Sequence, residues 1–139
     1  MTARPHSRKN PVTGETLVRG VRRITLRYKV YSVDVDMPGW YAEDDQDGET
    51  GIYDAQDMLV SDRALRIMKA REQGLLEPTE IRKIRKRLKL TQKQAGELIG
   101  GGPNAFQKYE AGDVMLSKAA DTALRLLGND PARLQELST

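Results

Sequence analysis

The sequence predicts an α+β protein, with a small antiparallel β-sheet and one helix in its front half and an all-helical rear half. Apolar and polar residues alternate between Glu15 and Tyr53, a pattern typical of half-buried strands. From Asp54 onward the apolar residues recur at helical spacing, and glycine and proline clusters separate the segments. With 139 residues, the chain can form one medium domain or two small ones.

The front half predicts roughly three strands. Two runs alternate with polar neighbours, namely Ile24, Leu26 and Tyr28, then Val33 and Val35. Pro38-Gly39 and Gly48–Gly51 are expected to form turns. A sheet of this size has only marginal stability by itself. Because the chain has no cysteine, neither disulfides nor thiolate zinc sites can stabilise the sheet further. Oligomerisation or a binding partner is therefore the expected source of extra stability.

Helical periodicity runs from Asp54 to about Gly74, which is suited to a C-cap. The candidate buried residues of this helix are Met58, Leu65, Ile67 and Met68. We interpret residues 75–78 as a short linker, because Pro78 suits the first turn of the next helix. The expected organisation is an N-terminal domain over 1–74 and a second domain over 79–139.

The N-terminus carries basic residues but no targeting segment. Arg4, Arg8 and Lys9 are followed by no apolar run of the kind that a secretion signal contains, and no apolar run approaches the length of a membrane span. We expect a cytoplasmic, soluble protein that does not contact a membrane, with His6 in a disordered leader.

The net charge of +3 conceals an uneven distribution. Lysine and arginine are absent between Lys29 and Arg63, where acidic residues gather around Glu43–Glu49. Seven basic residues lie instead between Arg82 and Lys93, a span of two adjacent helical segments in which no acid occurs: Arg82, Lys83, Arg85, Lys86, Arg87, Lys89 and Lys93. Such a stripe is typical of a surface that contacts nucleic-acid phosphates, although a solvated helix face can have the same composition.

The stretch from Leu90 to Gly112 has the pattern of a helix-turn-helix. Thr91 and Gln94 can form a capping box, Gly100–Gly102 permit a tight reversal, and Pro103 can open the next helix. The residues expected to face inward are Ile81, Ile84, Leu88, Ala95, Leu98, Ile99, Phe106 and Tyr109. The alternative is a plain helical hairpin with a polar surface, which the combination of cap, turn and spacing disfavours.

This pattern leaves Asn104, Gln107 and Lys108 on the outer face of the second helix, the helix that meets base edges in a major groove. Asn and Gln amides can pair with adenine, and Lys can donate to guanine or to a phosphate. Gln92 and Lys93, at the start of the first helix, are better placed for phosphates. Double-stranded DNA is therefore the expected partner.

Two further helices are predicted at the C-terminus. Ser117 can cap a helix that runs to about Leu127 and ends at Gly128-Asn129, and Asp130-Pro131 can start a last short helix. Because one reader helix contacts only a few base pairs, specific binding calls for a homodimer on a palindromic operator. The candidates for the dimer contact, or for completing the core, are Ala120, Leu124, Leu127, Leu134 and Leu137.

Little in the sequence favours an enzyme. His6 is the single histidine, cysteine is absent, and no serine has a recognisable base nearby. We expect no catalytic residue, no bound metal and no cofactor. A calcium-binding loop within Glu43–Asp54 would have its glycine, but Pro38-Gly39 precludes an entering helix and the twelfth position is Asp instead of Glu. The acidic segment is either a solvated loop or a docking surface for a basic partner.

Residues 78–127 resemble the Xre/Cro-type helix-turn-helix domain, with Leu90-Thr-Gln-Lys-Gln-Ala at its centre. More narrowly, Gly100-Gly-Gly-Pro-Asn-Ala-Phe followed by Lys-Tyr-Glu is similar to the MqsA-type antitoxins. The resemblance implies that Asn104 and Lys108 contact operator bases. It also implies that the front domain binds zinc and a toxin, and that this toxin is a small ribonuclease.

The zinc ligands of that family are missing. Its members carry two Cys-x-x-Cys pairs flanking a β-hairpin, and the corresponding positions here are Asn10, Thr13, Ala42 and Asp45. No tetrahedral thiolate site can form from these residues. Either this lineage lost the metal or the cysteines were replaced by engineering.

We therefore expect a sequence-specific repressor that controls its own operon and neutralises an mRNA-cleaving toxin through its N-terminal domain. One alternative is a stand-alone Xre-type regulator whose front domain senses a ligand or an ion and has no toxin. Another is a protein-interaction module that binds no duplex.

Overall fold

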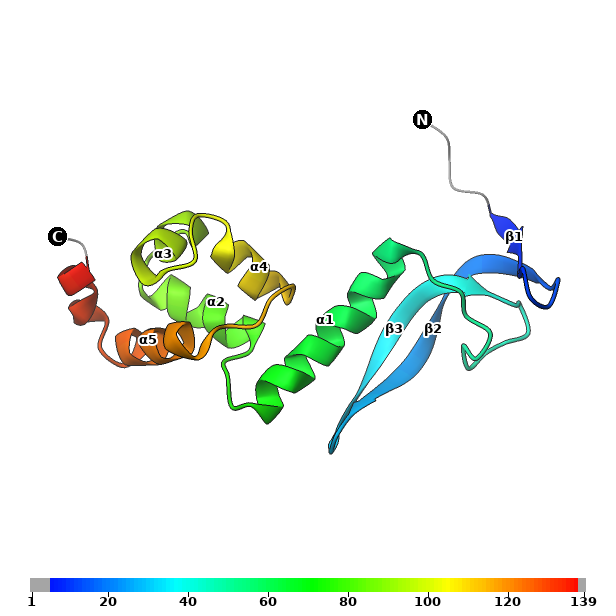
Figure 1. Cartoon of the computed structure of the whole chain (residues 1–139), viewed down its shortest axis with the longest axis horizontal. Helices are drawn as coiled ribbons and strands as arrows, with labels where there is room; N and C mark the ends of the chain where they lie inside the picture. The colour runs from blue at the N-terminus through cyan, green and yellow to red at the C-terminus, as the bar shows by residue number, and fades with distance from the viewer. Residues whose placement is uncertain (1–5, 138–139) are drawn as a thin grey trace. The chain divides into compact units, whose positions relative to one another are not determined.

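The computed structural model describes residues 6–137 and confirms the α+β class (Figure 1). Its elements are β1 (Ser7–Lys9), β2 (Thr16–Tyr28), β3 (Tyr31–Tyr41), α1 (Ala55–Glu72), α2 (Pro78–Arg87), α3 (Gln92–Ile99), α4 (Ala105–Ala111), α5 (Lys118–Asn129) and the 3-10 helix η1 (Pro131–Leu137). The chain divides into two compact units, Met1–Leu65 and Arg66–Thr139. The boundary lies inside α1, ahead of the linker predicted over 75–78. No helix within the described range is long and apolar enough to cross a membrane.

The three strands form one antiparallel sheet in the order β1-β2-β3. β2 and β3 pair along their lengths and are joined by a two-residue connection at Lys29-Val30, where Lys29 has a φ of 53°. Positive φ is common in such hairpin turns. The predicted alternation is confirmed, since apolar residues pair on one face as Ile24↔Val35 and Leu26↔Val33, and polar residues pair on the other as Arg23↔Asp36 and Thr25↔Asp34.

Pro38 and Gly39 lie within β3, so the turn predicted there is wrong. They pair with Val21 and Gly20 of β2. β3 is an edge strand, where a proline is tolerated because its missing N–H removes no inner ladder bond. Gly39 is required by close packing, because a Cβ atom there would lie 2.8 Å from the ring of Tyr53.

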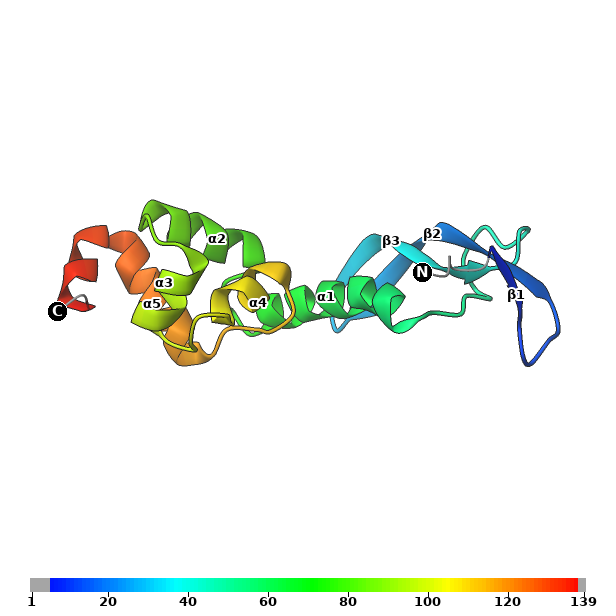
Figure 2. The same ribbon diagram turned by 90° about the horizontal axis from the view of Figure 1, so that it is seen from above.

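β1 occupies part of the segment that was expected to be a disordered leader. Residues 1–5, and with them Arg4, lie outside the described residues. The backbone carbonyl of His6 accepts a hydrogen bond from Arg19 N at 3.4 Å, and Ser7–Lys9 pair with β2. The leader prediction is wrong from His6 onward, because a turn at residues 10–14 folds the chain back onto β2 (Figure 2).

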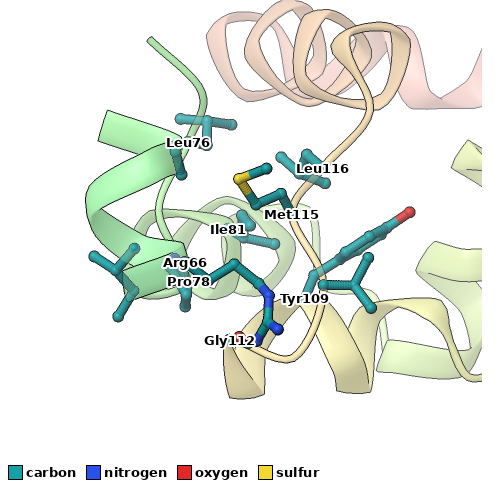
Figure 3. Close-up of a pocket in the computed structure, with 11 residues that line it drawn as sticks. Arg66, Leu76, Pro78, Ile81, Tyr109, Gly112, Met115 and Leu116 are labelled. Atoms are coloured by element: carbon teal, nitrogen blue, oxygen red, sulfur yellow. Dashed lines mark hydrogen bonds between the residues drawn. The ribbon is translucent and has the colours of Figure 1, made fainter. Parts of the chain in front are cut away.

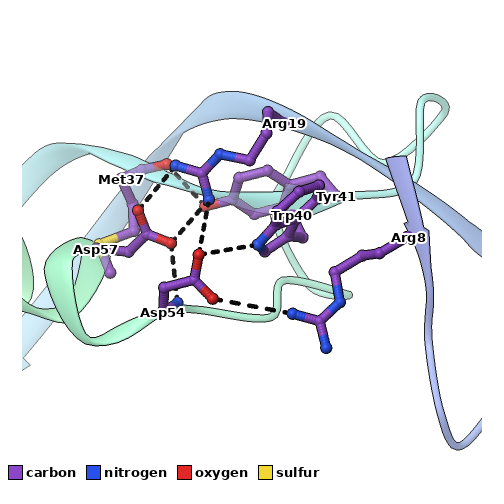
Figure 4. Close-up of polar contacts among 7 residues, drawn as sticks. All are labelled: Arg8, Arg19, Met37, Trp40, Tyr41, Asp54 and Asp57. Carbon is purple, nitrogen blue, oxygen red and sulfur yellow. Dashed lines mark hydrogen bonds and ion pairs between the residues drawn. The ribbon is translucent and has the colours of Figure 1, made fainter. Parts of the chain in front are cut away.

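A polar network joins the sheet to the first turn of α1. The Arg19 guanidinium donates two hydrogen bonds of 2.9 Å to Asp57, which is 3% exposed, and Trp40 Nε1 donates to Asp54 at 3.2 Å (Figure 4). The hydrogen bond to Asp57 raises the pKa of Arg19 above its usual value. The guanidinium groups of Arg8 and Arg19 also lie 5.6 and 5.1 Å from the centre of the Trp40 ring, within cation–π range. Trp40 packs with Leu17, Ala42 and Ile52 to form the small core of this unit.

The prediction of buried residues in α1 is only partly right. Met68 is buried and Leu65 and Ile67 are half-buried, but Met58 is 40% exposed. In this first turn Asp57 faces the sheet instead, because its carboxylate binds Arg19. An ion pair therefore replaces the apolar contact that the helical pattern predicted.

The second unit has the five helices expected from Pro78 onward, including η1. Its core contains six buried residues, Leu76, Ile81, Ala95, Phe106, Leu116 and Leu124, and Ile84, Leu90, Ile99, Tyr109 and Ala120 pack around them. Pro78 is the first residue of α2, and Ser117 Oγ accepts a hydrogen bond from Ala120 N, so both predicted helix starts are confirmed. The connection between α1 and α2 is held by α5, because Leu76 N donates to Asp121 Oδ1 at 2.7 Å.

Candidate nucleic-acid interface

The first helix of the helix-turn-helix begins at the capping box that the sequence predicts. Thr91 Oγ1 accepts a hydrogen bond from Gln94 N at 3.1 Å, and Gln94 Oε1 accepts one from Thr91 N at 2.9 Å. These bonds satisfy two backbone donors that would otherwise lack an intrahelical partner. They also fix Gln92 and Lys93 in the first turn of α3, where Gln92 is half-buried and Lys93 is exposed.

The reversal after α3 uses three left-handed glycines and a fourth glycine that the sequence did not single out. Gly100, Gly101 and Gly102 have φ values of 128°, 94° and 90°, a region that favours glycine. Gly96, inside α3, is buried because the reversal folds back over it, and Gly102 N donates to the Gly96 carbonyl at 3.2 Å. A Cβ atom at Gly96 would collide with the carbonyl oxygen of Gly102. The helix-turn-helix therefore needs glycine on both sides of this contact.

Pro103 does not open the second helix, which is a correction to the sequence prediction. α4 starts at Ala105 with Asn104 as its N-cap, so Pro103 lies before the cap. Ala105 N donates to the Gly102 carbonyl at 3.2 Å, which makes Pro103 part of a turn. The fixed φ of proline suits a turn as well as a first helical residue.

The outer face of α4 carries the three polar residues that were predicted to read bases. Asn104, Gln107 and Lys108 are all exposed. Asn104 occupies the N-cap position, but its side chain makes no capping hydrogen bond. On the inner face Phe106 is fully buried, and its ring lies 5.3 Å from that of Tyr109 at 79°. The inner aromatic pair thus orients the helix and leaves the three polar side chains facing solvent.

A buried ion pair holds α4 against α2. The Arg85 guanidinium donates to both carboxylate oxygens of Glu110, at 2.7 and 2.9 Å, and to the Leu90 carbonyl at 2.9 Å. The side chains of Arg85 and Glu110 are only 12% and 6% exposed. The hydrogen bond to Glu110 raises the pKa of Arg85. Arg85 therefore has a structural role in packing α4 on α2. This corrects its inclusion in the predicted phosphate-contacting stripe.

An open groove runs between α2, α3 and α4. Its polar lining includes Arg82, Thr91, Gln92 and Gln107. Arg82 is exposed at the edge of this groove. Lys83, Lys86 and Lys89 are also exposed but do not line the groove. Arg87 is also exposed, but it donates to the Gly128 carbonyl at 3.1 Å. The groove brings two predicted phosphate-contacting residues, Arg82 and Gln92, together with one predicted base reader, Gln107.

The four positions that the resemblance assigns to zinc ligands do not fit that metal. Asn10 Oδ1 accepts hydrogen bonds from Val12 N and Thr13 N, and Thr13 Oγ1 accepts one from Glu15 N. Ala42 has no donor atom in its side chain. From residue 6 to residue 137, no group of three or more His, Asp or Glu side chains is arranged to hold a metal ion.

Asp45, at the fourth of these positions, closes its own loop. Its carboxylate accepts hydrogen bonds from the backbone N–H groups of Gly48, Glu49 and Thr50, at 2.9, 3.2 and 2.8 Å, and from Thr50 Oγ1 at 2.6 Å. The Thr50 hydroxyl contributes most to lowering the pKa of Asp45 to about 2, and the backbone donors lower it further. A carboxylate engaged in this way stabilises the acidic loop itself, which the calcium alternative did not anticipate.

Comparison with known proteins agrees with this architecture. Antitoxin MqsA of Escherichia coli (strain K12) is 45% identical over 60 residues, which make up 43% of this chain and 46% of the relative. That match therefore spans less than half of the relative's length. The family described as the antitoxin component of bacterial toxin-antitoxin system, MqsA, matches residues 9–138. Because this second match covers nearly the whole sequence, the chain belongs to the MqsA family of antitoxin components of bacterial toxin–antitoxin systems.

Proposed function

We propose that the protein is an antitoxin that binds operator DNA through α4 and represses transcription of its own operon. The observation that carries this proposal is the state of Asn104, which is exposed at the N-cap of α4 with its side chain unused for capping. Its amide oxygen can therefore accept a hydrogen bond from the N6 amino group of an adenine, and its amide N–H can donate one to N7. Lys108 follows four residues later on the same face, within reach of guanine or of a phosphate.

The residues around α4 support a division between base reading and phosphate binding. Gln107 shares the open groove with Gln92, and Lys93 is exposed in the first turn of α3. The N-terminal end of a helix attracts phosphate through its unpaired N–H groups. We assign Gln92 and Lys93 to phosphates, and Asn104, Gln107 and Lys108 to base edges.

A homodimer on a palindromic operator is part of the proposal, because one reader helix covers only a few base pairs. α5 and η1 form an apolar groove lined by Ala123, Leu126, Leu127 and Leu137. Leu126 and Leu137 are 57% and 45% exposed, so this groove leaves apolar surface in contact with water. A second copy packed on this groove would remove that apolar surface from water.

We further propose that the N-terminal unit neutralises a small mRNA-cleaving toxin. Membership of the antitoxin family supports a toxin partner. The negative charge of the acidic loop supports a toxin of the RNA-binding class. Glu43, Asp44, Asp47 and Glu49 are all exposed, and a protein that binds RNA presents basic surface that complements them. The protein would act in the cytoplasm by binding alone, without catalysing a reaction.

A reporter assay tests both halves of the proposal. The promoter upstream of the gene would drive a reporter, and the protein would be supplied from a second promoter. We expect wild-type protein to silence the reporter and to restore growth when the neighbouring reading frame is expressed as the toxin. Unchanged reporter output would contradict the repressor, and growth arrest despite ample antitoxin would contradict the neutralisation.

A further inference from the structure

We propose that Arg66, in the second half of α1, is a positioning residue for DNA reading that fixes the C-terminal end of α4. The inference rests on the proposed DNA-binding function and adds to it a residue that lies outside the helix-turn-helix. Arg66 belongs to the same compact unit as α4, although it lies 46 residues before its hydrogen-bond partner Gly112 in the sequence. Its role therefore depends on tertiary structure alone.

α4 is too short to hold its own orientation. It has seven residues, and its N-cap supplies no side-chain hydrogen bond. At its other end Gly112 adopts a left-handed conformation with φ 82°, and Asp113 N donates back to the Lys108 carbonyl at 2.9 Å. A helix of two turns is unstable in isolation. Contacts from other elements must therefore set the direction in which Asn104 and Lys108 project.

Arg66 makes one of these contacts at the C-terminal end of α4. Its Nη1 atom donates a hydrogen bond of 2.7 Å to the carbonyl oxygen of Gly112. Figure 3 shows the guanidinium of Arg66 directed at Gly112. Carbonyl groups at a helix C-terminus lack intrahelical partners and carry the negative end of the helix dipole. A cationic donor at this place is favoured both by the hydrogen bond and by the charge.

Apolar packing holds Arg66 in place. Ala70 follows Arg66 by four residues and therefore lies on the same face of α1. Both residues line a pocket with Tyr109 and Leu116, and Ala70 and Leu116 are each 4% exposed. Tyr109 belongs to α4, so the same pocket brings the second half of α1 against the reader helix. The geometry thus makes this segment of α1 a support for α4.

The consequence of losing Arg66 would be selective. Arg85 would still hold α4 through Glu110, so the helix would remain but would lose one of the side-chain contacts that fix its C-terminal turn. Base readout requires side chains placed to within roughly 0.5 Å, whereas phosphate contacts tolerate small displacements. We therefore expect Arg66 to contribute to discrimination between DNA sequences more than to general DNA affinity.

The test compares Arg66→Ala and Arg66→Lys with Arg71→Ala in the full-length chain. Arg71→Ala is the matched control, because Arg71 is also on α1 but pairs with Glu77 instead of α4. Binding would be measured to the DNA upstream of the gene and to a scrambled duplex, well below the melting temperature of every variant. Hydrogen exchange would report the protection of the Gly112 and Asp113 amides.

We expect Arg66→Ala to weaken operator binding about tenfold while changing scrambled-duplex binding by less than about twofold. Exchange at Gly112 and Asp113 should accelerate, Arg66→Lys should recover most of the operator affinity, and Arg71→Ala should match wild type. Equal weakening on both duplexes, or unchanged exchange in Arg66→Ala, would overturn the proposal. Wild-type protein that did not prefer its operator would refute the proposed function instead, and the exchange data would then decide whether Arg66 supports α4.

Discussion

Asn104 is the residue on which the proposed reading of DNA sequence depends most directly. Replacing it with alanine removes the amide. It costs α4 no capping hydrogen bond, because the Asn104 side chain makes none. We expect Asn104→Ala to cost about 1–3 kcal/mol at the operator and little on random DNA. Fluorescence anisotropy with both duplexes measures the difference. Asn129→Ala, at the exposed end of α5, is the matched control, and uniform weakening on every sequence would make Asn104 a phosphate-contacting residue.

Asp45 gives the stability of the N-terminal unit a defined pH dependence. Its pKa is about 2 in the folded chain against an ordinary value of 3.8, so folding favours the charged carboxylate. The stabilisation is therefore fully present above about pH 3.8 and is lost as the pH falls toward 2. The free energy of unfolding of wild type should exceed that of Asp45→Asn near neutral pH, and the difference should shrink across this window.

Asp44→Asn is the matched control for that experiment, because it removes the same charge from an exposed neighbour. It should follow the wild-type curve closely. If Asp45→Asn and Asp44→Asn had the same unfolding free energy at neutral pH, the loop-closing role of the Asp45 carboxylate would be wrong.

Among the elements, the α3–α4 reversal makes the sharpest prediction. An alanine in place of a glycine inside a helix ordinarily stabilises it by about 1 kcal/mol. At Gly96 the sign should reverse, since the added Cβ would collide with the Gly102 carbonyl, and overpacking typically costs about 1–3 kcal/mol. Urea denaturation of Gly96→Ala measures this change, with Glu97→Ala as a control in the same helix. A Gly96→Ala variant more stable than wild type would contradict the close approach of the turn.

The elements also show which features a sequence can predict. Thr91 with Gln94 and the glycines at 100–102 are local signals, because each acts within a few residues of itself. The turn predicted at Pro38-Gly39 is wrong for the same reason. The local pattern cannot reveal that the ring of Tyr53 lies against Gly39. Contacts that join distant segments were not predictable from periodicity or charge, and the clearest examples are Arg85 with Glu110, Arg66 with Gly112 and Arg19 with Asp57.

For the whole molecule, the lack of a zinc-ligand set among residues 6–137 is the main departure from what the resemblance implied. The residues at the zinc positions are engaged in hydrogen bonds within their own loops or, in the case of Ala42, lack a ligand atom. We expect exhaustive treatment with a chelator to leave the melting temperature unchanged, and added Zn²⁺ to leave it unchanged as well. Differential scanning calorimetry measures both. A melting temperature lowered by the chelator and restored by Zn²⁺ would contradict this expectation.

The measurement that bears most directly on the proposed function is binding to the DNA upstream of the gene, titrated with salt and compared with a scrambled duplex of equal length. We predict tight binding to the upstream DNA at one dimer per palindrome, and weaker, more salt-dependent binding to the scrambled duplex. Equal and steeply salt-dependent binding to both would mean that the basic surface of α2 recognises polyanions in general, and that Asn104 and Lys108 do not read sequence.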